Sequence, residues 1–159
     1  MIEFQEGGKL AQALTAAPEA RYLVAGSGGY GFITSVADMV ARNKAGKAFL
    51  TLEKGERPLP PAPVSGETVV VLTQAGRLVL FPLTEIREMA KGKGLMLIDL
   101  VKNDEVVGVA AIGNQPLRIE GSGRGGKASV QILDVKRRFG IHAIKCLWNQ
   151  VLRNLHPTT

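Results

Sequence analysis

Short apolar runs, joined in pairs by glycine-containing turns, recur along the chain. The first pair flanks the glycine cluster at 26–31, and the second pair flanks Ala75-Gly76. Both pairs are rich in β-branched and aromatic residues, and two such runs joined by a glycine turn are typical of a β-hairpin. The pattern therefore predicts two hairpins in the first two thirds of the chain.

The two hairpins belong to a longer internal repeat. Each is followed by an acidic residue in a short polar connection, a Gly-Lys turn and a further apolar run: Asp38, Gly46-Lys47 and 49–52 in the first copy, and Glu85, Gly92-Lys93 and 97–100 in the second. A weaker third copy begins at Val106. Hairpins that recur at this period are typical of propeller-like blades, each of which must pack on its neighbours. We expect the two further apolar runs to form third strands.

The repeat divides the chain into five expected parts. These are the edge of a preceding blade (1–20), a first blade (21–63), a second blade (64–104), a degenerate or partial third blade (105–135) and a divergent tail (136–159). Proline lacks a backbone donor, so we expect the proline-rich stretch 58–63 to be a stiff link that cannot continue a sheet. Apolar spacing over 141–155 favours a helix. The predicted fold class is all-β with about two complete blades, partial flanking blades and a C-terminal helix.

Composition limits the cellular setting and the chemistry. A single cysteine, Cys146, excludes an internal disulfide and fits a reducing compartment. The first twenty residues lack the apolar core of a signal peptide, and the longest clean apolar runs, such as 69–72, are far too short to span a membrane. No carboxylate pair or nucleophile–base cluster is apparent. We expect a cytoplasmic protein with no membrane partner and no catalytic residue in this chain.

The net charge of +6 is unevenly placed along the chain. Residues 1–117 hold twelve basic and twelve acidic residues, whereas 118–159 hold eight basic residues against Glu120 and Asp134. This asymmetry favours a polyanionic partner, although a basic solvated surface is the alternative explanation.

Several segments carry a resemblance to a known family. They are Gly29 to Phe32 (GYGF), 40–48 (VARNKAGKA), 73–77 (TQAGR), Phe81-Pro82 and 91–94 (KGKG). Over roughly residues 20–100, and less clearly to 127, the chain resembles the C-terminal domain of the topoisomerase IV A-type polypeptide and, more distantly, that of gyrase A. The resemblance implies a β-pinwheel of four-stranded blades that exchange strands and whose basic outer rim holds and bends duplex DNA.

The resemblance also implies what other parts of such an enzyme supply. The catalytic tyrosine, ATP hydrolysis and Mg²⁺ would belong elsewhere in the holoenzyme, so no cofactor is expected here. Besides duplex DNA, the expected partners are the remaining domains of the same topoisomerase IV polypeptide and the separate ATPase polypeptide. The whole would be a chromosome-associated bacterial enzyme that relaxes and decatenates DNA.

Basic residues on glycine turns are the predicted DNA contacts. The resemblance assigns this role to Arg42, Lys44, Lys47, Arg77, Lys91 and Lys93. The tract 123–127 is similar to the basic glycine-rich box of gyrase A and adds Arg124 and Lys127, but it departs from the box in ways that put chiral wrapping in doubt. Lysine and arginine release counterions from phosphates, and glycine lets phosphate approach the backbone. No recognition helix is apparent, so sequence-independent binding is expected.

Two other functions fit parts of the sequence. Residues 26–31 satisfy the GxGxxG pattern directly after an apolar run, and Glu53 lies about twenty residues further on, as in dinucleotide-binding oxidoreductases. Against this, the second copy keeps the hairpin pattern at 73–76 without those glycines. A propeller-like protein-interaction module, using blade faces instead of a basic rim, is the other alternative.

Overall fold

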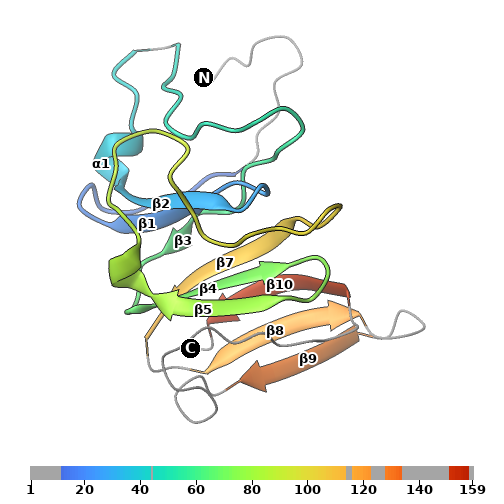
Figure 1. Ribbon diagram of the computed structural model, residues 1–159. Helices are drawn as coiled ribbons and strands as arrows, with labels where there is room; N and C mark the ends of the chain where they lie inside the picture. The colour runs from blue at the N-terminus through green and yellow to red at the C-terminus, as the bar shows by residue number, and fades with distance from the viewer. Residues whose placement is uncertain (1–11, 44, 114–115, 123–127, 134–150, 158–159) are drawn as a thin grey trace.

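The computed structural model describes residues 12–43, 45–113, 116–122, 128–133 and 151–157, and over these the chain is built mostly of antiparallel strands (Figure 1). The strands are β1 (Arg21–Ala25), β2 (Tyr30–Ser35), β3 (Ala62–Pro63), β4 (Thr68–Thr73), β5 (Leu78–Pro82), β6 (Leu95–Met96), β7 (Val106–Ile112), β8 (Leu117–Ser122), β9 (Ala128–Leu133) and β10 (Val151–Pro157). A four-residue helix, α1 (Val36–Met39), and a 3-10 turn, Leu83–Glu85, follow the first two hairpins. No helix in these parts is long and apolar enough to cross a membrane.

Three sheets share one plan. Their strand orders are β3-β1-β2-β6, β7-β4-β5 and β10-β8-β9. In each sheet a hairpin supplies two neighbouring strands, and a strand from later in the chain pairs antiparallel with the first strand of that hairpin. The all-β blade fold predicted from the repeat is confirmed, and the weak third copy forms a sheet on the same plan as the others.

Strands from one repeat complete the sheet of another. β6 follows the second hairpin in the chain but pairs with β2 of the first sheet, through Tyr30 opposite Met96 and Gly31 opposite Leu95. The expected intervals 21–63, 64–104 and 105–135 therefore describe repeats of sequence more than they describe whole sheets.

The central sheet lies between the other two, and both of its faces are buried (Figure 1). On β4, Val69 and Val71 belong to the core shared with the first sheet, whereas Val70 and Leu72 belong to the core shared with β8 of the third. Alternate residues of a strand point to opposite faces. Burial on both faces explains why this strand reads as an unbroken apolar run instead of an alternating one.

The expected third strands at 49–52 and 97–100 are wrong in detail. In the first copy only Leu50 forms a bridge, to Gly92. In the second copy the short strand ends at Met96, and Leu97 and Ile98 are instead buried in the core. Gly94, at φ +87°, lies so close to β2 that an added Cβ would be 2.2 Å from the Gly31 carbonyl oxygen. The close approach brings the chain onto β2 immediately after Gly94, which is why the strand begins at Leu95.

The proline-rich stretch does continue a sheet, contrary to expectation. Ala62–Pro63 forms β3 at the edge of the first sheet, paired with β1. The donors on either side of the prolines are those of Leu59, which bonds the Ala25 carbonyl oxygen at 2.9 Å, and Val64, which bonds that of Arg21 at 3.0 Å. Prolines are tolerated because an edge strand can leave a donor position empty.

The expected C-terminal helix is wrong where the structure describes it. Residues Val151–Pro157 form β10, antiparallel to β8. Apolar residues four apart, such as Val151 and Leu155, suit one face of a helix, but an even spacing suits a strand equally well. Of the expected edge blade, residues 12–20 contain no strand; residues 1–11 and 134–150 lie outside the described part of the chain.

Candidate nucleic-acid interface

The glycines at 26–31 form the turn of a hairpin, so the dinucleotide-binding prediction is wrong. β1 and β2 are antiparallel, with Ala25 opposite Gly31, and no helix begins at the glycines. Gly29 has φ +86°, a value that favours glycine in tight turns. An added Cβ on Gly31 would be 2.6 Å from the Val24 carbonyl oxygen, and one on Gly28 would meet the carboxylate of Glu56. Turn geometry and packing therefore account for these glycines.

Glu53, the acidic residue of that prediction, instead pairs with Lys93. The Lys93 ammonium donates a hydrogen bond to Glu53 Oε1 and lies 3.9 Å from the centre of the Tyr30 ring. The hydrogen bond and the nearby charges, Glu53 first, raise the pKa of Lys93 above its ordinary value. The Lys93 side chain is 30% exposed and that of Glu53 is 66% exposed. Lys93 is thus a half-buried cation held by its own protein.

Three other predicted contacts lie on two loops beside the first sheet. Arg42, Lys47 and Lys91 are exposed. The loops that carry Lys47 and Lys91 are joined by Gly92, whose carbonyl oxygen accepts from the Thr51 N–H at 2.9 Å and whose N–H donates to the Phe49 carbonyl oxygen at 2.8 Å. Lys47 also donates to the Asp38 carbonyl oxygen. Within the described residues, neither Arg42 nor Lys91 forms an ion pair.

Arg77 occupies a different turn, between β4 and β5. It is half-buried, and its Nη1 donates to the Asp99 carbonyl oxygen at 2.8 Å. Its backbone N–H donates to Thr73 Oγ1 at 3.2 Å. The guanidinium therefore ties the hairpin turn to a neighbouring segment. The other three predicted contacts, Lys44, Arg124 and Lys127, lie outside the described residues.

A second pair of exposed lysines was not predicted from the sequence. Lys54 and Lys102 each precede a residue in the left-handed conformation, Gly55 at φ 91° and Asn103 at φ 65°. Such a conformation favours glycine and asparagine. The signal was present as Lys-Gly-Glu at 54–56 and Lys-Asn-Asp at 102–104, two matching triplets. These triplets lie beyond the expected third strands, where the repeat was not followed.

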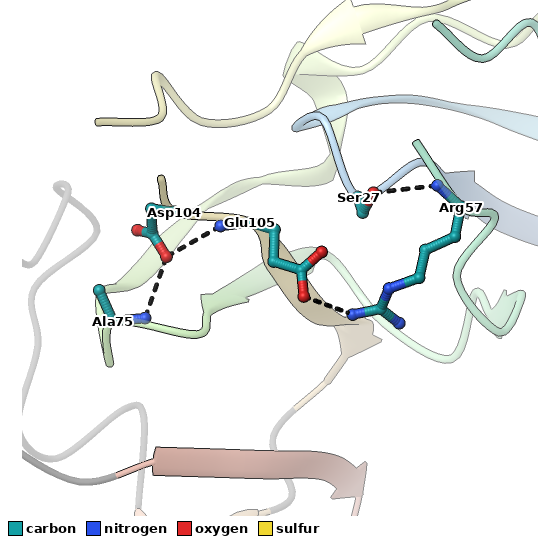
Figure 2. Close-up of polar contacts among 5 residues, drawn as sticks. All are labelled: Ser27, Arg57, Ala75, Asp104 and Glu105. Atoms are coloured by element: carbon teal, nitrogen blue, oxygen red, sulfur yellow. Dashed lines mark hydrogen bonds and ion pairs between the residues drawn. The ribbon is translucent and has the colours of Figure 1, made fainter. Parts of the chain in front are cut away.

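The carboxylate after each left-handed residue covers the hairpin turn of its own sheet. Asp104 Oδ1 accepts from the backbone N–H groups of Ala75 and Glu105, both at 3.0 Å, as Figure 2 shows. The Glu56 carboxylate lies against Gly28 and accepts from the Glu53 N–H at 2.9 Å. The two loops are therefore structural equivalents in successive blades.

An ion pair joins the residues that come next in the two loops. Arg57 Nη2 donates to Glu105 Oε1 at 2.9 Å (Figure 2). Around it, Ser27 Oγ accepts from the Arg57 N–H at 3.0 Å, and the Ser27 carbonyl oxygen accepts from the Val106 N–H at 2.9 Å. These contacts connect the first and second sheets at their turn end, so the loops bearing Lys54 and Lys102 are held in a defined relation.

Comparison with known proteins gives consistent relatives. A family model described as DNA gyrase C-terminal domain, beta-propeller, matches residues 21–57 and 67–112, more than half of the chain. The A-type polypeptide of DNA topoisomerase 4 from Neisseria gonorrhoeae is 38% identical over 149 residues, covering 86% of this chain and 19% of that protein. Its counterpart in Escherichia coli strain K12 is 34% identical over 96 residues, covering 59% of this chain and 13% of that protein. The chain thus spans a fifth or less of these relatives.

Solved structures agree with the observed topology. The E. coli ParC C-terminal domain superposes with a TM-score of 0.71 at 27% identity, covering 82% of this chain and 56% of that one. The DNA gyrase A C-terminal domain gives a TM-score of 0.61 at 20% identity, covering 76% of this chain and 40% of that one, which shows a shared fold. With three sheets of one plan, strand exchange between repeats and these matches, the chain belongs to the DNA gyrase C-terminal domain family of β-pinwheel domains found in type IIA topoisomerases.

Proposed function

We propose that this chain holds and bends duplex DNA without sequence preference, on behalf of a topoisomerase IV. The observation that carries the proposal is the group of exposed cations Arg42, Lys47 and Lys91 on loops beside the first sheet. Arg42 and Lys91 have no carboxylate partner within the described residues, so their charge is available to an external anion. Duplex DNA is the polyanion that the family membership favours.

The elements present favour phosphate contacts over reading of base edges. In the described parts of the chain the longest helix has four residues, too short to serve as a recognition helix in a major groove. Lysines and arginines on loops bind phosphates through charge, and such contacts carry no direct sequence information. Exposed lysines at equivalent places in successive blades, Lys54 and Lys102, would extend such contacts along a curved duplex.

The remaining steps of the reaction belong to other parts of the enzyme in this proposal. Strand cleavage, ATP hydrolysis with Mg²⁺ and DNA passage would be carried out by the other domains of the same polypeptide and by the separate ATPase polypeptide. This chain would supply a DNA-holding surface for relaxation and decatenation in the bacterial cytoplasm.

A DNA titration tests the proposal. Binding of a labelled duplex is measured by fluorescence anisotropy between 50 and 200 mM salt. If about six phosphates are neutralised, affinity should fall on the order of a thousandfold over that range. The triple variant Arg42→Ala, Lys47→Ala, Lys91→Ala should bind at least tenfold more weakly at 100 mM salt, because each phosphate contact contributes roughly additively.

Two controls define what the titration means. Circular dichroism should show that the triple variant stays folded, since none of the three side chains is buried. Lys91→Ala should cost more affinity than Arg21→Ala, which removes an exposed cation that already faces Glu88 at 3.9 Å. Full affinity in the triple variant would move the contact surface elsewhere, and equal losses in the two single variants would mean that net charge alone matters.

A further inference from the structure

Lys93 differs from the other predicted DNA contacts because a carboxylate already occupies it. Its ammonium bonds Glu53 and lies over the Tyr30 ring at 3.9 Å from the ring centre. The ring and the carboxylate together fix the direction of a side chain that is otherwise flexible. Any phosphate oxygen that binds Lys93 in the same place has to take the position of the Glu53 carboxylate.

The backbone of Glu53 is fixed, whereas its side chain is not. The Glu56 N–H donates to the Glu53 carbonyl oxygen at 3.0 Å, and the Glu53 N–H donates to Glu56 Oε2 at 2.9 Å. The Glu53 side chain is nevertheless 66% exposed. The carboxylate can therefore swing into solvent while the loop keeps its shape.

The second blade shows that this loop does not need a carboxylate there. Val101 occupies the equivalent position, and its carbonyl oxygen accepts from the Asp104 N–H at 3.1 Å, as that of Glu53 accepts from Glu56. Val101 is 58% exposed, so no packing requirement selects for it. The loop forms with either residue, and the contact with Lys93 is what Glu53 adds.

We propose that Glu53 is a built-in competitor for DNA phosphate at Lys93, displaced when a duplex binds the first blade. The inference rests on the proposed DNA-binding function and deepens it by adding a regulator of one contact. Occupied by Glu53, Lys93 adds little to weak or distant encounters. A phosphate brought close by Arg42 and Lys91 competes at high local concentration and replaces the carboxylate.

The test is a DNA titration of the whole 159-residue chain with Glu53→Gln. Exposed ion pairs are weak, so affinity for a labelled duplex at 100 mM salt should rise about two- to fivefold. Freeing one more cation should also steepen the slope of log affinity against log salt by about 0.9. Glu53→Val, which copies the residue of the second blade, should give the same result and guards against an effect of the glutamine side chain.

Two backgrounds separate this inference from a general charge effect. Glu67→Gln removes the same charge from an exposed carboxylate that forms no ion pair within the described residues, and should change affinity less than Glu53→Gln. With Lys93→Ala already present, Glu53→Gln should give no more than the Glu67→Gln effect. Equal effects of the two glutamine variants, or a Glu53→Gln gain that persists without Lys93, would overturn the inference alone. Absence of binding by the wild type and every variant would overturn the proposed function, and the inference with it.

Discussion

The turn loops of the first and second blades have one backbone plan and different charges. Both pass through a left-handed residue, Gly55 or Asn103, and both place a carboxylate over the hairpin turn of their own sheet. At the next position the first blade has Arg57 and the second has Glu105, and these two form the ion pair between the sheets.

The difference teaches which features the fold requires. The left-handed residue and the carboxylate recur because the turn geometry needs the first and the backbone donors need the second. Position 53 and its equivalent, Val101, differ because the loop closes through backbone atoms alone. Positions free of structural demands are where one blade has gained a contact, between Glu53 and Lys93, that the other lacks.

The largest expected effect comes from removing the carboxylate of the second loop. Asp104→Ala leaves the N–H groups of Ala75 and Glu105 without their acceptor, and such losses cost about 1–3 kcal/mol. Urea unfolding should show this loss in the free energy of unfolding. Asp104→Asn keeps an acceptor oxygen, and because Asp104 Oδ2 is buried without a hydrogen-bond partner in the described residues, it should retain most of the stability. Equal losses in both variants would mean that the negative charge, and not the acceptor, is what matters.

A smaller effect follows from making the first turn resemble the second. Ala75 is the second blade's equivalent of Gly28, and an alanine Cβ at 28 would be 1.7 Å from Glu56 Oε1. Gly28→Ala should displace that carboxylate from the Glu53 N–H and cost about 1 kcal/mol in thermal or urea unfolding.

Shortening the carboxylate should then restore the fit. Glu56→Asp in the Gly28→Ala background copies the Ala75 and Asp104 arrangement, and the double variant should be more stable than Gly28→Ala alone. Additive losses in this double-mutant cycle would show that the two loops are not equivalent in the way their backbones indicate.

Much of the fold was predictable because apolar runs and glycine turns determine hairpins locally. The hairpins around 26–29 and 74–77 were placed correctly from these signals alone. The pairing partners were not, since an apolar dipeptide such as Leu95-Met96 signals a strand without saying which edge it joins. Likewise the even spacing over 151–155 fitted a strand and a helix equally well, and only pairing with β8 decides between them.

The candidate interface was less predictable than the fold. Sequence could select lysines on turns, but whether each is free depends on residues distant in the chain. Lys93 is held by Glu53, forty residues earlier, and Arg77 by the Asp99 carbonyl oxygen. Lys91, which the same Gly-Lys pattern selects, has no such partner among the described residues.

The smallest expected effect isolates the one contact by which the two loops differ. Because the bond to Glu53 is the main cause of the raised pKa of Lys93, Glu53→Val should lower that pKa toward its ordinary value. A raised pKa means that the folded state holds the proton more tightly, so the pair's small contribution to stability is fully present below the ordinary lysine pKa and is lost as pH rises through the folded one. Nuclear magnetic resonance titration of the lysine side chains should find one signal moving to lower pKa in Glu53→Val, and the same signal missing in Lys93→Ala. An unchanged set of lysine pKa values would mean that the two charges do not interact in solution and that the two loops are electrostatically alike.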